Sequence, residues 1–312
     1  MKKPVLILFG LLLLAIISIY FVIPQKIKTT NVIDIDATDI NVSKFLVNKK
    51  AWVKWWPGQH NAIDSSNYNL KGVIYILKES TNSEMKAIIK FDDIKLNTQL
   101  IYATTGEDIC EVTWFTEMQS SLNPYTRVAD FIKIKRITKD IDGILKSFKK
   151  FMQTDVNVYG MPIKISQIKN PIVLALTTNT PNYPTPEVIY NLVGELKKQI
   201  NEQNARGLDS PMLNIHVNET KGYQIMIAIP INKVIMPGKN MAINNLVKNG
   251  NQLETNVKGG KNVILNAYAQ LKNYQTAHRL ISPAMPYESL ITNRFTEKDT
   301  AKWVTKIFWP IF

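Results

Sequence analysis

The chain has 312 residues, 45% of them hydrophobic and 20% charged, which excludes an intrinsically disordered protein. Its formal net charge is +13, but no run of lysine and arginine with interleaved aromatic residues indicates a nucleic-acid groove, so no nucleic acid is expected as a partner. The single cysteine, Cys110, excludes an intrachain disulfide, and the three histidines are scattered. We therefore expect neither a metal site nor a bound cofactor.

The first 25 residues are a separate segment. Pro4 to Ile23 contains no charged residue, and a helix of that length spans about 30 Å, the thickness of the hydrocarbon core of a bilayer. Signal peptides have shorter apolar runs and end in small residues, whereas this run ends in bulky ones. We expect an uncleaved transmembrane helix over 1–25, with cleavage as the alternative. Because Lys2 and Lys3 precede it, we expect a single-pass membrane protein with a cytoplasmic N-terminus and extracytoplasmic domains.

Residues 26–155 predict one α+β domain. An alternating stretch over 29–37 predicts a strand, and a short helix follows at Asp39. Further alternating stretches, separated by short polar turns, predict an antiparallel sheet that includes a strand over 130–137. Apolar residues at helical spacing over 140–153 predict a closing amphipathic helix.

Residues 156–312 show a pattern that occurs twice. In the first copy, Thr185 caps a helix whose apolar residues recur every four positions, and strands lie on both sides of it. In the second copy we expect strands on both sides of Gly259–Gly260, then a shorter helix beginning at Leu271 and two more strands. The copies end in GYQIMIAIPIN and KWVTKIFWPIF, which align with an offset of 80 positions. Since a half-sheet with one helix cannot cover its own apolar face, we expect two βαββ modules that share a core and leave a cleft between them.

Two segments of this half, GGKNVILNAY and PYESLITNRFTEKDTAKWVTKIFWPI, together with MIAIPIN, resemble the gyrase-inhibitor-like (GyrI-like) family. This family is also known as the effector-binding domain of bacterial multidrug-responsive transcription regulators. The resemblance covers about half of the chain. It implies a duplicated βαββ effector-binding domain over 156–312 with a small-molecule cleft between the modules. The regulators also carry a helix-turn-helix unit, which this chain lacks, so the resemblance does not extend to DNA binding.

The first domain resembles the START-like/SRPBCC family of polyketide cyclases and lipid-transport proteins more loosely. The resemblance rests on IDIDATDINVSKFLVNKKAWVKWWP and on the closing DGILKSFKKFMQ. It implies a helix-grip fold over 26–155 that encloses an apolar cavity beneath its long helix. The tryptophans of the first segment, Trp52, Trp55 and Trp56, predict core packing and leave a lipid-binding cavity as the alternative.

Glu288, in PYESL, is the candidate ligand-binding residue. Its place matches an acidic residue that, in the GyrI-like family, faces the cleft and pairs with cationic aromatic ligands. A carboxylate surrounded by aromatic rings suits a lipophilic cation, because charge pairing and stacking on ring faces act together. The same module supplies four candidate rings, Tyr268, Tyr274, Tyr287 and Trp303. Because a Glu on an alternating strand more often faces solvent, the opposite interpretation stays open.

The expected function is therefore that of a membrane-anchored protein that binds a hydrophobic or cationic small molecule in the GyrI-like cleft. One alternative is a hydrolase of small reactive electrophiles that uses Glu288 as a general base, as some proteins that resemble this family do. Another is a lipid-binding or scaffold protein that acts through the START-like domain. The sequence names neither the ligand nor a catalytic residue.

Overall fold

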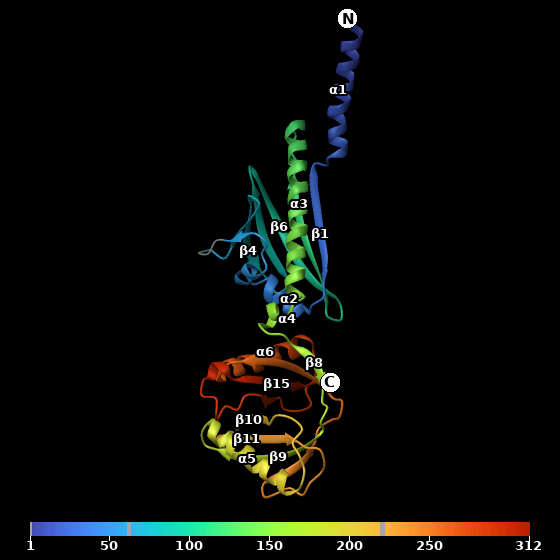
Figure 1. Cartoon of the computed structure of the whole chain (residues 1–312). Helices are drawn as coiled ribbons and strands as arrows, with labels where there is room; N and C mark the ends of the chain where they lie inside the picture. Colours follow the sequence, from blue (N-terminus) through green and yellow to red (C-terminus); the bar gives the residue numbers. More distant parts are fainter. Residues whose placement is uncertain (1, 61–63, 219–221) are drawn as a thin grey trace. The chain divides into compact units, whose positions relative to one another are not determined.

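The computed structural model describes residues 2–60, 64–218 and 222–312, without the side chains of Lys2, Lys3 and Leu6. The chain divides into two compact units, Met1–Thr154 and Asp155–Phe312. The predicted boundary between 155 and 156 lies one residue from this division. Both units are mixed α and β structures with an antiparallel sheet, as expected (Figure 1).

The N-terminal unit has a sheet of seven described strands in the order β1-β7-β6-β5-β4-β3-β2, with helix α3 packed against it. A short helix and a 3-10 turn follow β1 and precede β2. The elements of this unit are α1 (Lys2–Val22), β1 (Lys26–Ile35), α2 (Asp39–Leu46), η1 (Lys49–Lys54), β2 (Gln59–His60), β3 (Asn67–Leu70), β4 (Val73–Ser80), β5 (Glu84–Phe91), β6 (Ile94–Gly106), β7 (Ile109–Gln119) and α3 (Pro124–Met152).

Helix α3 is longer than predicted, because the expected strand over 130–137 is helical and the prediction of a strand there was wrong. Asn123 Oδ1 accepts hydrogen bonds from the backbone N–H groups of residues 125 and 126, and Pro124 occupies the first turn, so the helix begins there. The short alternation of apolar residues in DFIKIKRI also fits a helix, since Ile134 and Ile137 continue the buried stripe to Ile141.

Aromatic side chains fill the interior between α3 and the sheet. Trp52 is fully buried and has ring centroids within 6.2 Å of those of Trp55, Trp56, Tyr68 and Trp114. Its Nε1–H donates to the carbonyl oxygen of residue 46 at 2.6 Å. The prediction that the tryptophans are core residues is therefore confirmed.

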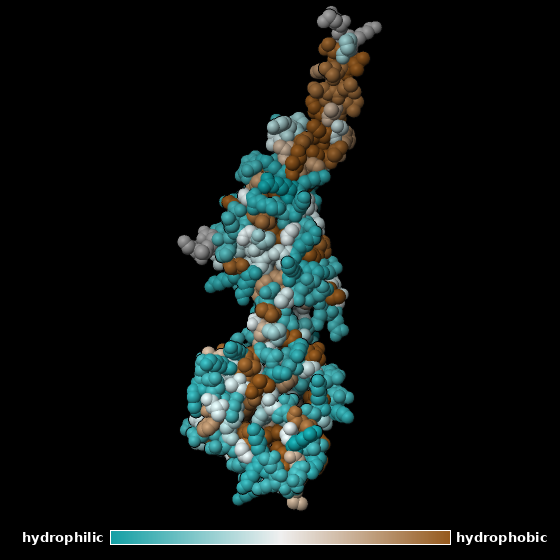
Figure 2. Space-filling view, viewed as in Figure 1, coloured by the Kyte–Doolittle hydropathy of each residue, from teal (hydrophilic) through white to brown (hydrophobic). Residues whose placement is uncertain are grey.

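Helix α1 carries exposed apolar side chains along its whole described length, which form a continuous hydrophobic surface (Figure 2). At its end, Arg127 of α3 donates from Nε and Nη2 to the Ile23 carbonyl oxygen at 2.9 and 2.5 Å and lies over the Tyr20 ring. Within the described residues, no helix combines the length and the apolar character that crossing a membrane requires. The predicted transmembrane helix is thus not supported by the structure.

The C-terminal unit has a sheet of eight described strands in the order β12-β9-β11-β10-β14-β15-β13-β8. The second half of this order repeats the first in reverse, with β10 and β14 as neighbours at the centre. Its elements are α4 (Asp155–Tyr159), β8 (Lys164–Gln167), β9 (Ile172–Thr180), α5 (Pro186–Glu202), β10 (Met212–Asn218), β11 (Gly222–Pro230), β12 (Met241–Asn245), β13 (Asn251–Lys258), α6 (Lys261–Ala277), β14 (Tyr287–Leu290), η2 (Thr300–Lys302) and β15 (Val304–Pro310).

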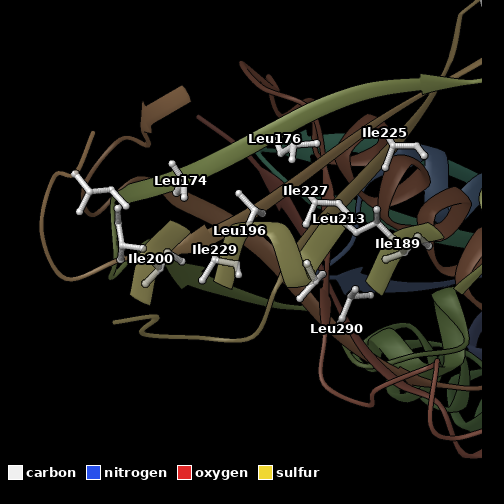
Figure 3. Packing of buried hydrophobic residues seen from close by; sticks show 13 residues of the cluster. Leu174, Leu176, Ile189, Leu196, Ile200, Leu213, Ile225, Ile227, Ile229 and Leu290 are labelled. Atoms are coloured by element: carbon white, nitrogen blue, oxygen red, sulfur yellow. The ribbon is translucent and has the colours of Figure 1, made fainter. Parts of the chain in front are cut away.

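Each module lends one strand to the other half of the sheet. Strand β8 precedes the first module but pairs with β13 of the second, and β12 precedes β13 but pairs with β9 of the first. Helix α5 packs on β9 and β11, and α6 packs on β13 and β15. A buried aliphatic cluster lies beneath α5; it includes Leu196 and Ile200 of the helix and Leu174, Ile227 and Ile229 of the sheet (Figure 3).

Helix α6 begins where a second strand was expected, immediately after Gly260, so the predicted hairpin at Gly259–Gly260 was wrong. Gly259 has φ +145°, and a Cβ there would lie 2.7 Å from Val263, so only glycine fits this turn into the helix. The residues of KNVILNAY that become buried, Ile264 and Ala267, are three apart and continue to Leu271, which is helical spacing.

Candidate ligand-binding site

Glu288 lies at the centre of the sheet of the C-terminal unit, on its apolar side. In the register of β14, Glu288 is paired with Leu213 of β10 and with Ile307 of β15, and both partners are fully buried. Leu290, two residues along the same strand, belongs to the aliphatic cluster beneath α5. Glu288 is 5% exposed, so its side chain does not face solvent.

The carboxylate of Glu288 is bound by a buried arginine. Nη2 of Arg294 donates to Oε2 of Glu288 and to Oγ1 of Thr305, the latter at 2.8 Å. Arg294 is 6% exposed and lies in the segment between β14 and η2. Within the described part of the chain, its Nε–H has no hydrogen-bond partner. The guanidinium is therefore held chiefly through one of its nitrogens.

Aromatic side chains surround this ion pair. The guanidinium carbon of Arg294 lies 5.2 Å from the centroid of the Trp303 ring, within the range of a cation–π interaction. The Tyr190 hydroxyl accepts from the backbone N–H of Arg294 at 3.1 Å and donates to the carbonyl oxygen of Thr292 at 3.0 Å. Tyr190 is on α5, so this helix holds the arginine segment in place.

Burial and the charges of the pair affect the ionisation of Glu288 and of two further tyrosines. Burial raises the pKa of the Glu288 carboxyl, and the Arg294 guanidinium opposes that rise. Burial also raises the pKa of the Tyr268 phenol well above its usual range, and the Glu288 charge adds to that rise. The same two causes raise the pKa of Tyr183, which lies just before α5. The charge of Glu288 therefore acts on Tyr183, which precedes α5, and on Tyr268, which belongs to α6.

The structure brings together three of the five residues singled out from the sequence and places the other two elsewhere. Glu288, Tyr268 and Trp303 belong to the site, Trp303 through its contact with the arginine. Tyr274 lies 5.2 Å from the Tyr159 ring and 4.2 Å from the His278 ring, measured between centroids, and makes a separate cluster. Tyr287 donates from its hydroxyl to Gln252 Oε1 at 2.9 Å and stacks on Phe308, on the opposite face of the sheet.

Sequence reasoning missed Arg294, Tyr190 and Tyr183. Arg294 follows Glu288 by six positions in a segment without periodic pattern, so no spacing rule indicates that the two meet. The tyrosines belong to the first module, and only the pairing of β10 with β14 brings that module to Glu288. A basic residue shortly after a buried acidic residue was the one available signal in the sequence.

No family model matches the chain, and no curated protein matches it. Among solved structures, the chain is similar to the EcmrR C-terminal domain, with 16% identity and a TM-score of 0.41 over 49% of this chain and 98% of that chain. It is also similar to SAV2435 bound to tetraphenylphosphonium, with 10% identity and a TM-score of 0.33 over 49% and 94%. A START superfamily protein from Mycobacterium smegmatis has 10% identity and a TM-score of 0.26 over 39% and 98%. At these values the similarities establish neither a family nor a function.

Proposed function

We propose that the C-terminal unit binds a hydrophobic organic cation at Glu288, in exchange for Arg294. The observation that carries this proposal is that the Glu288 carboxylate already binds a buried cation, the Arg294 guanidinium. A delocalised guanidinium is paired with a buried carboxylate and lies 5.2 Å from the Trp303 ring centroid, and the charges of the pair act on Tyr190 and Tyr268. A carboxylate, an enclosing set of rings and low exposure are the features that a lipophilic cation requires.

The exchange is favourable for a ligand that water solvates weakly. Taking a guanidinium out of water costs several kcal/mol, which the ion pair recovers only in part. A large aromatic cation spreads its charge, so its desolvation costs less and its apolar surface gains from burial. Without a ligand Arg294 is buried, but it lies outside the strands, between β14 and η2, so a cation that binds Glu288 can displace its side chain without breaking the sheet.

A pair of probes of equal shape tests this proposal, namely tetraphenylphosphonium and tetraphenylborate. We expect Arg294→Gln to bind tetraphenylphosphonium about tenfold more tightly than the unchanged protein, because the internal competitor is gone; that factor corresponds to about 1.4 kcal/mol. Tetraphenylborate should not bind either protein. Isothermal titration calorimetry on the full chain in neutral lipid nanodiscs measures both affinities.

The double variant Glu288→Gln/Arg294→Gln serves as the matched control, since it removes the carboxylate from a site that already lacks the arginine. Binding of the phosphonium should be lost in it. Equal affinity of the single and the double variant, or equal binding of the borate, would show that shape and apolarity alone determine binding and would refute a role for Glu288.

The hydrolase alternative is less well supported. A general base must present a free lone pair to a water molecule or substrate, and the Arg294 guanidinium stabilises the ionised carboxylate at the position where such a proton transfer would begin. The Glu288 oxygen that Arg294 binds is therefore not free to accept a proton. Binding is thus the function that the geometry favours over turnover.

The C-terminal unit is also a better candidate for ligand binding than the N-terminal unit. The helix-grip arrangement implied by the START-like resemblance needs an open cavity beneath the long helix. In the N-terminal unit, Trp52, Trp114 and Tyr75 occupy the space beneath α3, and all three are fully buried. A lipid in that unit would have to displace these rings.

Membrane association through α1 is the second part of the proposed function. Side chains such as Leu8, Phe9 and Leu14 are 64–68% exposed, so the helix presents apolar surface in every direction and gains free energy by entering lipid. We expect the protein to stay in the membrane fraction after extraction at alkaline pH, and a variant lacking residues 1–22 to be released. Release of the full chain would refute the association.

The single-pass topology and its orientation remain predictions of the sequence. Addition of protease to intact spheroplasts tests them, since extracytoplasmic domains would be degraded and cytoplasmic ones would be protected.

A further inference from the structure

We propose that the face of the C-terminal sheet opposite to α5 and α6 has a second binding site, which takes an amphiphile with an anionic head and an apolar chain. This site is independent of Glu288, because side chains alternate between the two faces of a strand. Tyr287 and Ser289 of β14 point to this open face, on either side of Glu288. Two adjoining cavities lie here, one polar and one apolar.

The polar cavity, of about 330 Å³, lies over β13, β14, β15 and β8. Its floor holds Gln252 and Glu254, which are only 4% and 6% exposed although they lie on the face opposite to α6. Glu254 pairs with Lys164 at 3.1 Å and with Lys306 at 3.7 Å. Burial raises the pKa of Glu254, but hydrogen bonds from Lys164 and Ser166 outweigh this and hold it below its ordinary value, so the carboxylate stays ionised and fixes both ammonium groups.

Charge in this cavity favours an anion. Lys164, Lys306 and Lys169 line it, against the carboxylates of Glu254 and Asp209, so positive groups are in excess. The side chains of Lys164 and Lys306 are 64% and 40% exposed, which leaves their remaining N–H donors free to reach a ligand. A carboxylate or phosphate head can therefore join the lysine pair from the solvent side.

The apolar cavity, of about 170 Å³, lies over β9, β10 and β11. Val173, Ala175 and Ala228 form its floor, and Met212 and Met226 line it with flexible thioether side chains, which adapt to chains of different shape. Met212, Leu246 and Tyr287 line both cavities, so the two form one continuous groove. A chain can lie over the alanines while its head remains among the lysines.

Methionine methyl groups provide a direct test on the full chain in nanodiscs of phosphatidylcholine. With ¹³C-methyl methionine, added decanoate should shift the resonances of Met212 and Met226 in a saturable way, and neutral decanol should bind about tenfold more weakly. Met212→Leu and Met226→Leu variants assign the two signals.

Lys306→Gln and Ala228→Phe are the informative variants. The first removes one head contact but leaves Lys164 on Glu254, so the fold is retained, and should weaken decanoate binding about tenfold; the second fills the apolar floor and should abolish it. Lys272→Gln, the same charge change on the exposed side of α6, is the matched control and should have no effect.

Nanodiscs that contain phosphatidylglycerol distinguish the sources of the head group. If they produce the same methyl shifts without decanoate, the ligand is an anionic membrane lipid; if only free decanoate does so, it is a soluble amphiphile. Either result supports the site. No saturable shift of the two methionines with either probe, or equal decanoate affinity in Lys306→Gln, Ala228→Phe and Lys272→Gln, would overturn it.

Discussion

Glu288→Gln is expected to lower the free energy of unfolding of the C-terminal unit by about 3–5 kcal/mol. The substitution leaves the Arg294 guanidinium buried without a counter-charge, and Thr305 Oγ1 offers it only a neutral acceptor. Hydrogen exchange followed by mass spectrometry is the suitable measurement, because peptides of β14 and β15 report on this unit alone.

Two further variants distinguish the loss of the ion pair from a general sensitivity of the sheet to substitution. Glu288→Leu with Arg294→Met replaces both charges by apolar groups and should restore most of the lost stability. Glu254→Gln removes another buried carboxylate, but its lysine partners are partly exposed and can be solvated, so its effect should be much smaller. Equal losses for Glu254→Gln and Glu288→Gln would contradict the assignment.

Trp52→Ala is expected to destabilise the N-terminal unit by about 3–5 kcal/mol, since it removes a large, fully buried side chain. The substitution opens a cavity among Trp55, Trp56 and Trp114 and leaves the Leu46 carbonyl oxygen without its donor. Urea unfolding followed by far-ultraviolet circular dichroism measures the loss.

Phe115→Ala is the control for Trp52→Ala. Phe115 is also aromatic and lies on β7, but it is 40% exposed, so its truncation should change stability by only about 0.5 kcal/mol. If Trp52→Ala has an equally small effect, the interior beneath α3 is loosely packed and open to a ligand, which would favour the lipid-binding alternative.

Local sequence signals correctly predicted the elements for which the capping residue and the spacing of apolar residues indicate the same secondary structure. Helix α5 begins at Pro186 after the Thr185 cap, as expected. The buried face of α5 differs, however, from the predicted one: Ile189 and Val193 are buried, whereas Val188 and Leu192 are only partly buried at the edge of the aliphatic cluster. The short apolar run at residues 130–137 fits both the two-residue period of a strand and the 3.6-residue period of a helix, and alternation alone predicted the wrong element. Only the length of the helix that begins at Pro124 distinguishes the two.

The candidate site was predictable in part for reasons of geometry. Glu288 was singled out through the GyrI-like resemblance, whereas alternation along the strand alone favoured a solvent-facing glutamate. Tyr287 could have been excluded from the site of Glu288, because adjacent residues of a strand face opposite sides of the sheet. Arg294 depends on the path of an irregular segment and Tyr190 on the pairing of the two modules, and neither of these is encoded in local periodicity.

The exchanged strands of the C-terminal sheet determine how this unit can fold. Ile165 of β8 pairs with Leu253, and Ile243 of β12 pairs with Leu174, so each pairing joins distant parts of the chain. Such non-local pairings must close long loops before they stabilise anything, which slows folding. During synthesis, the first module leaves the ribosome with β8 unpaired and the outer edge of β9 open until the second module follows. The two modules therefore form one cooperative unit, and neither completes its share of the sheet alone.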